Sequence, residues 1–103
     1  MKKIFKVEPL PAVFARTVLL HHAMGDQALA NEVLGLFLQQ LATLKAKPWP
    51  KMDLNFEMHT LKGSAAAMGA LQLETIGRDW REIGPALQQR LSAAIAAFEA
   101  AAN

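Results

Sequence analysis

The chain has 103 residues, of which 52% are apolar, and it carries a formal net charge of +2 and no cysteine. A chain of this length supports one small domain with a single core, spanning residues 1–103. The lack of cysteine excludes disulfides and thiolate metal sites and favours a reducing compartment such as the cytoplasm. The positive charge is too weak and too dispersed to indicate nucleic-acid binding.

The basic start of the chain, residues 1–6, is similar to that of a signal peptide. Charged residues and prolines follow at once and interrupt any apolar segment, so we expect no signal peptide. These interruptions are Lys6, Glu8, Pro9, Pro11 and Arg16. No stretch approaches the roughly 18 apolar residues that a membrane helix needs. We therefore expect a cytoplasmic protein that does not interact with membranes.

Alanine, leucine, glutamine and methionine dominate the sequence, and no strand-like alternation occurs, so an all-α fold is expected. The first helix is predicted over about 11–24, with Pro11 suited to its start and Gly25 to its end. Its expected inward side consists of Val13, Phe14, Thr17, Leu20, His21 and Met24.

A second helix is predicted from the N-cap Asp26 to about Lys47, where the sequence 48–50, Pro-Trp-Pro, forces a break. Its apolar stripe consists of Leu29, Val33, Leu36, Phe37, Leu41 and Leu44. Three further helices are predicted, from about Lys51 or Asp53 to Met68, over about 71–83, and from Pro85 into the alanine-rich end. Short connections between long amphipathic helices are typical of antiparallel neighbours. We therefore expect an antiparallel up-down four-helix bundle over about 26–102, with the additional N-terminal helix across one end.

The third helix has two distinct faces at about 100° per residue. Its apolar seam, which must face the core, consists of Leu54, Met58, Leu61, Ala65 and Met68. His59 lies well off this seam, and Lys62 and Gly63 are nearly in line with it. The periodicity therefore predicts that the histidine points outward or lies at the rim of the bundle.

This outward face carries groups suited to phosphoryl transfer. A neutral imidazole nitrogen can attack phosphorus and form a labile phosphoramidate. The Cβ of Lys62 is expected roughly 5–6 Å from that of His59, so the ammonium can reach the phosphoryl oxygens. Gly63 costs about 1 kcal/mol relative to alanine inside a helix, which calls for a compensating reason. We expect that its missing side chain gives steric clearance for the phosphoryl group and for a partner.

Further residues of the same helix are expected to form a docking strip. Ala66, Ala67 and Ala70 keep the approach to His59 low. Phe56 and Met52 would add an apolar margin, or would instead pack against residues 48–50. Gly69 is expected to end the helix. We expect a partner protein to press a helix against this strip.

The run His59-Thr60-Leu61-Lys62-Gly63, followed by small residues and by Gly69, resembles the active-site helix of histidine-containing phosphotransfer (HPt) domains. The resemblance implies a four-helix bundle with an extra N-terminal helix. It also implies a phosphorelay intermediate, with a phosphohistidine at His59, that takes its phosphoryl group from a receiver-domain aspartate and gives it to another. Such domains have no kinase site and no cofactor, because the Mg²⁺ belongs to the receiver. The partners would be response-regulator receiver domains, including that of a hybrid histidine kinase.

The same resemblance implies a polar side chain from the following helix near the imidazole. Arg78 and Arg81 are candidates for this support of the phosphate, and Gln40 on the second helix is a weaker one. Many family members have a small residue where this chain has Met58, a difference that falls on the core seam. Because the face around His59 must stay accessible to a partner, we expect a monomer.

These residues allow three other interpretations. Adjacent histidines such as His21 and His22 point about 100° apart on a helix, so no metal site is expected. A sensor kinase's dimerisation and phosphorylation helices usually have an acidic residue directly after the histidine and a proline shortly after that, which Thr60 and Gly63 do not match. A helical-bundle adaptor, in which His59 is never phosphorylated, remains an open alternative.

Overall fold

The computed structural model describes residues 11–102, so the interpretation of residues 1–6 as no signal peptide falls largely on residues outside its description. Within the described residues the chain is all-helical and contains no strand, which confirms the predicted fold class. The helices are α1 (Arg16–His22), α2 (Gln27–Ala46), α3 (Leu54–Met68), α4 (Leu71–Ile83) and α5 (Leu87–Ala102), with the short 3₁₀ turns η1 (Trp49–Lys51) and η2 (Gly84–Ala86). None of these helices is long and apolar enough to cross a membrane.

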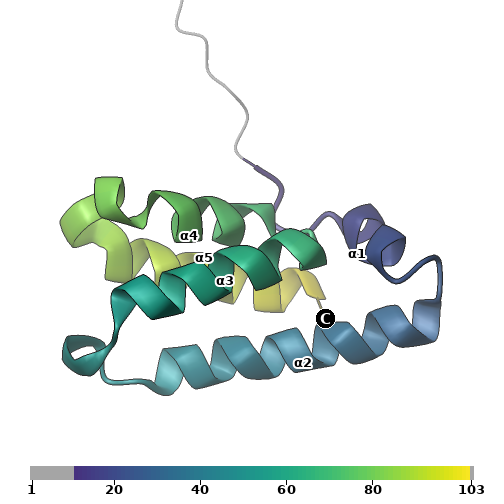
Figure 1. The fold of residues 1–103 in the computed structure, drawn as a ribbon, viewed down its shortest axis with the longest axis horizontal. Coiled ribbons are helices and arrows are strands. Elements are labelled where there is room, and N and C mark those ends of the chain that lie inside the picture. Colours follow the sequence, from purple (N-terminus) through teal and green to yellow (C-terminus); the bar gives the residue numbers. More distant parts are fainter. Residues whose placement is uncertain (1–10, 103) are drawn as a thin grey trace, which may run out of the picture.

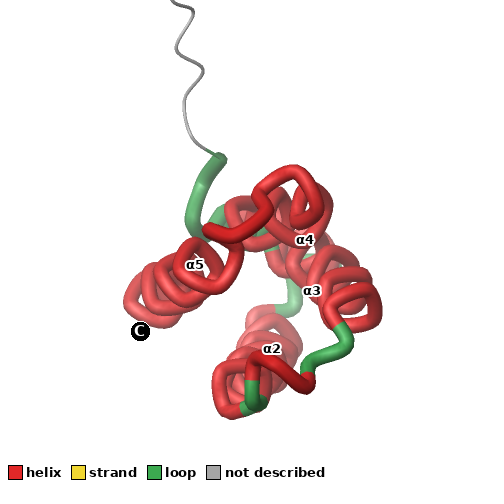
Figure 2. The backbone as a smooth tube through the Cα atoms, turned by 90° about the vertical axis from the view of Figure 1, so that its left-hand side faces the viewer, coloured by secondary structure: helices red, strands yellow, loops and turns green. Residues whose placement is uncertain are grey.

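The four longer helices lie along the long axis of the molecule, and α1 lies at the end where α2 begins (Figure 1). Viewed along that axis, α2, α3, α4 and α5 surround a common interior (Figure 2). Among the helix pairs, α3 packs most extensively against α4. The helix that carries His59 is therefore held mainly by the helix that follows it.

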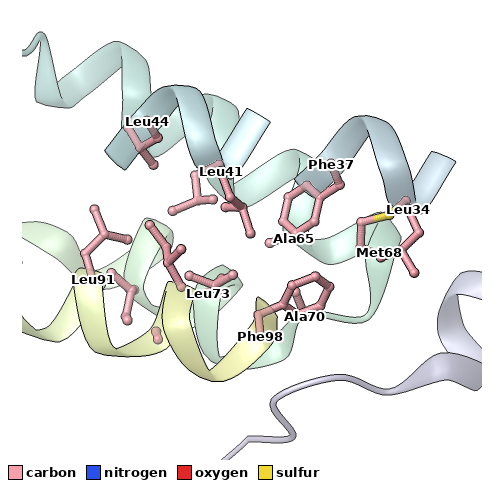
Figure 3. Close-up of a cluster of buried hydrophobic side chains, with 14 of the residues drawn as sticks. Leu34, Phe37, Leu41, Leu44, Ala65, Met68, Ala70, Leu73, Leu91 and Phe98 are labelled. Carbon is pink, nitrogen blue, oxygen red and sulfur yellow. The ribbon is translucent and has the colours of Figure 1, made fainter. Parts of the chain in front are cut away.

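The interior is filled with apolar side chains, and no polar or charged residue of the described part is buried in it. Side chains of α2, such as Phe37 and Leu41, point toward Phe98 of α5 (Figure 3). The ring of Phe98 lies 5.2 Å from that of Phe37 and 4.8 Å from that of Phe14, measured between centroids. Burial of such a side chain contributes roughly 1.5–3 kcal/mol. Phe98 thus joins α5 to α2 and to the segment that precedes α1.

Side-chain caps fix where α2 and α3 begin. Asp26 accepts a hydrogen bond from the backbone N–H of Leu29 at 3.1 Å, which confirms the predicted N-cap. Asp53 accepts one from the N–H of Phe56 at 3.2 Å, so α3 begins after Asp53. Each such cap is worth about 1 kcal/mol. Gly69, with φ of 75°, ends α3 in the left-handed conformation, as predicted.

The first helix is shorter than predicted, because residues 11–15 are not helical. Their backbone groups instead bond to the chain around the start of α4. The N–H of Ala15 donates to the carbonyl of Gly69 at 2.8 Å, and the carbonyl of Ala12 accepts from the N–H of Gln72 at 3.1 Å. The side-chain amide of Gln72 also donates to the carbonyl of Pro11 at 3.0 Å. These long-range hydrogen bonds replace the helical ones, and periodicity gives no sign of them.

The late start of α1 also makes part of its predicted inward side wrong. Thr17 and His21 are exposed, and Met24 is 93% exposed, whereas Leu19 and Ala23 are buried. The helical phase drawn from Pro11 does not apply to a helix that begins at Arg16. The remaining predicted residues, Val13, Phe14 and Leu20, are half-buried against the core.

The predicted stripe of α2 is only partly buried. Phe37, Leu41 and Leu44 belong to the core, but Leu29 is exposed and Leu36 is 61% exposed. The core instead takes Ala30 and Leu34. The apolar surface of α2 is therefore broader than the part that the other helices cover.

The seam of α3 agrees with the prediction. Met58, Leu61, Ala65 and Met68 are buried, and Leu54 is half-buried. Because these side chains face the interior, the opposite side of α3 faces outward.

Candidate functional site

The side chain of His59 is exposed on α3, on the side away from the seam. Within residues 11–102, no hydrogen bond or ion pair engages its imidazole. Both ring nitrogens are therefore available to solvent or to a partner. The helix holds the backbone in place while the ring itself stays accessible.

Lys62 and Gly63 share this side of α3 with His59. Lys62 is half-buried, and its ammonium forms no ion pair within the described part of the chain. Gly63 is exposed, and a Cβ placed on it would have no neighbouring atom within 4 Å. The space over this residue is therefore open, and the glycine is not needed for close helix packing.

An apolar groove lies beside these residues, between α2 and α3. It consists of two depressions of about 260 and 250 Å³ that share Gln40 in their walls. The first is lined by Val33, Leu36, Phe37, Gln40, Ser64, Ala67 and Met68. The second is lined by Gln40, Thr43, Leu44, Lys47, Phe56, Glu57 and Thr60. We call these two depressions together the α2–α3 groove.

The residues of the predicted docking strip differ in how exposed they are. Phe56 is 60% exposed, and Ala66 and Ala67 are half-buried at the surface. Met52 is half-buried and packs against the core next to Trp49, so the packing alternative describes it better. Phe56 contributes to the α2–α3 groove, as does Ala67.

The placement of Ala70 in the docking strip is wrong, because this residue is 0% exposed. The prediction extended the helical phase of α3 beyond its last residue, Met68. The left-handed turn at Gly69 ends the helix, and Ala70 is the N-cap position of α4, turned into the core. A docked partner therefore has no access to it.

Of the three candidates for support of the phosphate, Arg81 forms a hydrogen bond to α3. Its Nη2 donates to the side-chain oxygen of Asn55 at 3.0 Å, and its guanidinium lies 4.6 Å from the centre of the Trp80 ring. Asn55 precedes His59 by one helical turn on the same side of α3. Arg81 is thereby held beside the exposed side of the helix.

Arg78 and Gln40 are placed differently. Arg78 is exposed and donates from Nε and Nη2 to the carboxylate of the adjacent Asp79, at 3.0 and 3.3 Å. This hydrogen bond, together with the positive charge, lowers the pKa of Asp79. Gln40 lies across α3 from Arg81, in the α2–α3 groove next to Ser64 and Thr60. None of the three candidates donates a hydrogen bond to His59.

Gly77 in α4 is a residue that the sequence analysis missed. A Cβ placed on it would lie 3.0 Å from the carbonyl oxygen of Met58 and 3.0 Å from the backbone nitrogen of Lys62. The two helices therefore touch through their backbones beside the turn that carries His59. The only signal in the sequence was a glycine in a helix interior, which is unfavourable by about 1 kcal/mol and needs a structural reason.

Among the described residues, including His21 and His22, no group of three or more histidine, cysteine or acidic side chains is placed so that it could hold a metal ion. The sequence matches no family model, no curated protein and no solved structure. The chemistry at His59 must therefore be argued from its own surroundings.

Proposed function

We propose that this protein is a phosphorelay intermediate of a two-component signalling system. His59 accepts a phosphoryl group from the phospho-aspartate of one receiver domain and passes it to the aspartate of another. In this proposal the four longer helices are the antiparallel bundle of an HPt-like domain, and α1 is its additional N-terminal helix. The protein acts as a cytoplasmic monomer and has no kinase activity of its own.

The observation that carries the proposal is the open space around an exposed imidazole. His59 and Lys62 lie one helical turn apart. Among residues 11–102, a Cβ on Gly63 would meet no atom within 4 Å apart from its chain neighbours and the adjoining backbone of its own helix. A phosphoryl group bound to the imidazole and a receiver that surrounds it both need this space. The ammonium of Lys62 supplies positive charge for the phosphoryl oxygens.

The transfer step conserves atoms and charge. A ring nitrogen of neutral His59 attacks the phosphorus of the aspartyl phosphate, and a P–N bond forms as the P–O bond to the aspartate breaks. The aspartate leaves as a carboxylate with the electron pair of that bond, and the imidazole releases its proton to solvent. Return of the phosphoryl group to a second aspartate reverses these bond changes. The receiver supplies the Mg²⁺ that offsets the charge on the transferring group.

The α2–α3 groove supports docking of a receiver on this side of the molecule. Leu36 and Phe56 expose 61% and 60% of their surface along it. Exposed apolar side chains gathered beside polar ones are typical of protein interaction sites. A receiver helix seated on Phe56, Ala66 and Ala67 would bring its aspartate toward His59.

The proposal is tested with a receiver domain carrying a labelled aspartyl phosphate. The wild-type protein should gain label that is acid-labile and alkali-stable, as a phosphoramidate is. The matched control is His59→Gln, which keeps a side chain of similar size at an exposed position and should gain no label.

Two other outcomes would contradict the proposal. If no receiver of the source organism labels the wild-type protein, the alternative function as a non-phosphorylated adaptor is favoured. The α2–α3 groove supports this alternative, because binding in the groove needs no phosphorylation of His59. Labelling by ATP alone would indicate a kinase.

A further inference from the structure

The backbones of α4 and α3 come close together at Gly77. A Cβ on this residue would lie 3.0 Å from the carbonyl oxygen of Met58, 3.0 Å from the nitrogen of Lys62 and 3.1 Å from its Cα. Nonbonded heavy atoms are normally about 3.5–4.0 Å apart, and all three neighbours are backbone atoms that cannot rotate away. A side chain at this position would therefore require the backbones of α3 and α4 to shift by a few tenths of an ångström.

The atoms that Gly77 faces belong to the helical turn of the proposed site. In an α-helix the N–H of residue 62 donates to the carbonyl of residue 58, so Met58 and Lys62 close one turn of α3. His59 is the first residue inside that turn, and Lys62 is its last. The backbone of α4 therefore rests on the turn that carries both the imidazole and the ammonium.

A second contact lies one turn further along α4. Arg81 follows Gly77 by four residues, beyond Asp79, where φ of −103° and ψ of 17° interrupt the regular helix. It reaches Asn55 of α3, one turn before His59, through a hydrogen bond of 3.0 Å. The contact at Gly77 thus spans the turn that carries His59, and the contact at Arg81 lies one turn before His59 along α3.

We propose that Gly77 is a positioning residue for phosphoryl transfer at His59. Its missing side chain fixes the separation of α3 and α4, and thereby both the orientation of the His59 turn and the place of Arg81 beside it. Gly77 touches none of the reacting atoms and acts through the backbone of α3. The inference rests on the proposed function and adds to it a helix that determines the geometry of the site.

The test is Gly77→Ala, with transfer rates from a phosphorylated receiver measured by rapid quenching over a range of receiver concentrations. The new methyl group would lie 3.0–3.1 Å from backbone atoms of α3, so we expect the two helices to shift apart by a few tenths of an ångström. Small misplacements of reacting groups are costly, and we expect the maximal transfer rate to fall about tenfold. Docking involves the α2–α3 groove, so the receiver concentration that gives half the maximal rate should stay within about twofold. The maximal rate is read as a single-turnover rate constant with receiver in excess, because a loss of folded protein lowers the amplitude of labelling and leaves that rate constant unchanged.

Two controls isolate the effect of the contact. Gly35→Ala makes the same chemical change in the interior of α2, where no neighbour lies within 4 Å, and should transfer at the wild-type rate. Ile95→Val removes one methyl group from the core in α5 and lowers the melting temperature without touching the α3–α4 contact. It should also transfer at the wild-type rate while it is folded.

The outcomes distinguish a failure of the positioning role of Gly77 from a failure of the proposed function. A wild-type rate in folded Gly77→Ala, or an equal loss in Ile95→Val, overturns the positioning role and leaves the proposed function intact. A wild-type protein that takes no label overturns both. If Gly77→Ala does not fold, Arg81→Ala provides the test, since Arg81 is exposed. An unchanged maximal rate in that variant shows that α4 does not position the site.

Discussion

Gly63 and Gly77 lie in the interiors of neighbouring helices, and both are close to His59, but their surroundings are opposite. A side chain on Gly63 would enter open space, whereas the Cβ of one on Gly77 would lie only 3.0 Å from backbone atoms of α3. Both carry the same unfavourable helix propensity of about 1 kcal/mol relative to alanine. One glycine thus leaves open space at the surface, and the other allows the close approach of two helices.

The largest effect is expected from the variant Gly77→Leu. Four additional carbon atoms would have to enter a contact with no free space, and overpacking of this kind costs about 1–3 kcal/mol or more. We expect the free energy of unfolding to fall by at least about 2 kcal/mol in urea denaturation. A variant as stable as the wild type would show that α3 and α4 separate easily.

Gly63→Leu should have the opposite profile. Leucine is a better helix former than glycine, so the free energy of unfolding should stay the same or rise by up to about 1 kcal/mol. Phosphoryl transfer should fall more than about tenfold, equivalent to roughly 1.4 kcal/mol in the barrier, because the side chain enters the space over the imidazole. Label transfer from a phosphorylated receiver measures this. Normal transfer by the folded variant would make the steric argument for Gly63 wrong.

A smaller effect is expected from the two arginines that follow Gly77. Arg81→Ala removes the hydrogen bond to Asn55, so we expect transfer to slow several-fold, by up to about 1 kcal/mol in the barrier. Arg78→Ala removes only a pair with the adjacent Asp79 and should transfer like the wild type. Equal losses in the two variants would indicate a general effect of positive charge rather than the contact with α3.

The smallest effect concerns pH. The hydrogen bond from Arg78 lowers the pKa of Asp79, so this pair stabilises the fold above the usual pKa of an aspartate and ceases to do so as pH falls through the lowered value. The pair is exposed, and solvent screens it. Urea midpoints of Asp79→Asn should therefore match the wild type at acidic pH and be equal or slightly lower at neutral pH. A large difference between the two urea midpoints at neutral pH would contradict this prediction, because it would show that the Arg78–Asp79 pair contributes strongly to stability.

The local features of the site follow from the sequence. The seam of α3, its start after Asp53 and its end at Gly69 depend on periodicity and on capping residues, which act over a few positions. The exposure of His59 follows from the same periodicity.

The features that depend on distant segments do not follow from it. Residues 11–15 give up helical hydrogen bonds for bonds to the turn around Gly69, and no local pattern indicates this partner. Ala70 is buried because the chain direction changes at Gly69. Gly77 is explained only once α3 lies against it, because a close approach is a property of two helices.

The bonds between residues 11–15 and the start of α4 have a consequence for how this end of the molecule opens. The N–H groups of Ala15 and Gln72 are bonded across a long stretch of sequence, at 2.8 and 3.1 Å. These N–H groups can exchange with deuterium only when residues 11–15 separate from residues 69–72, so their exchange rate measures this local opening. The two amides therefore report how often the segment 11–15 detaches from the turn that follows α3.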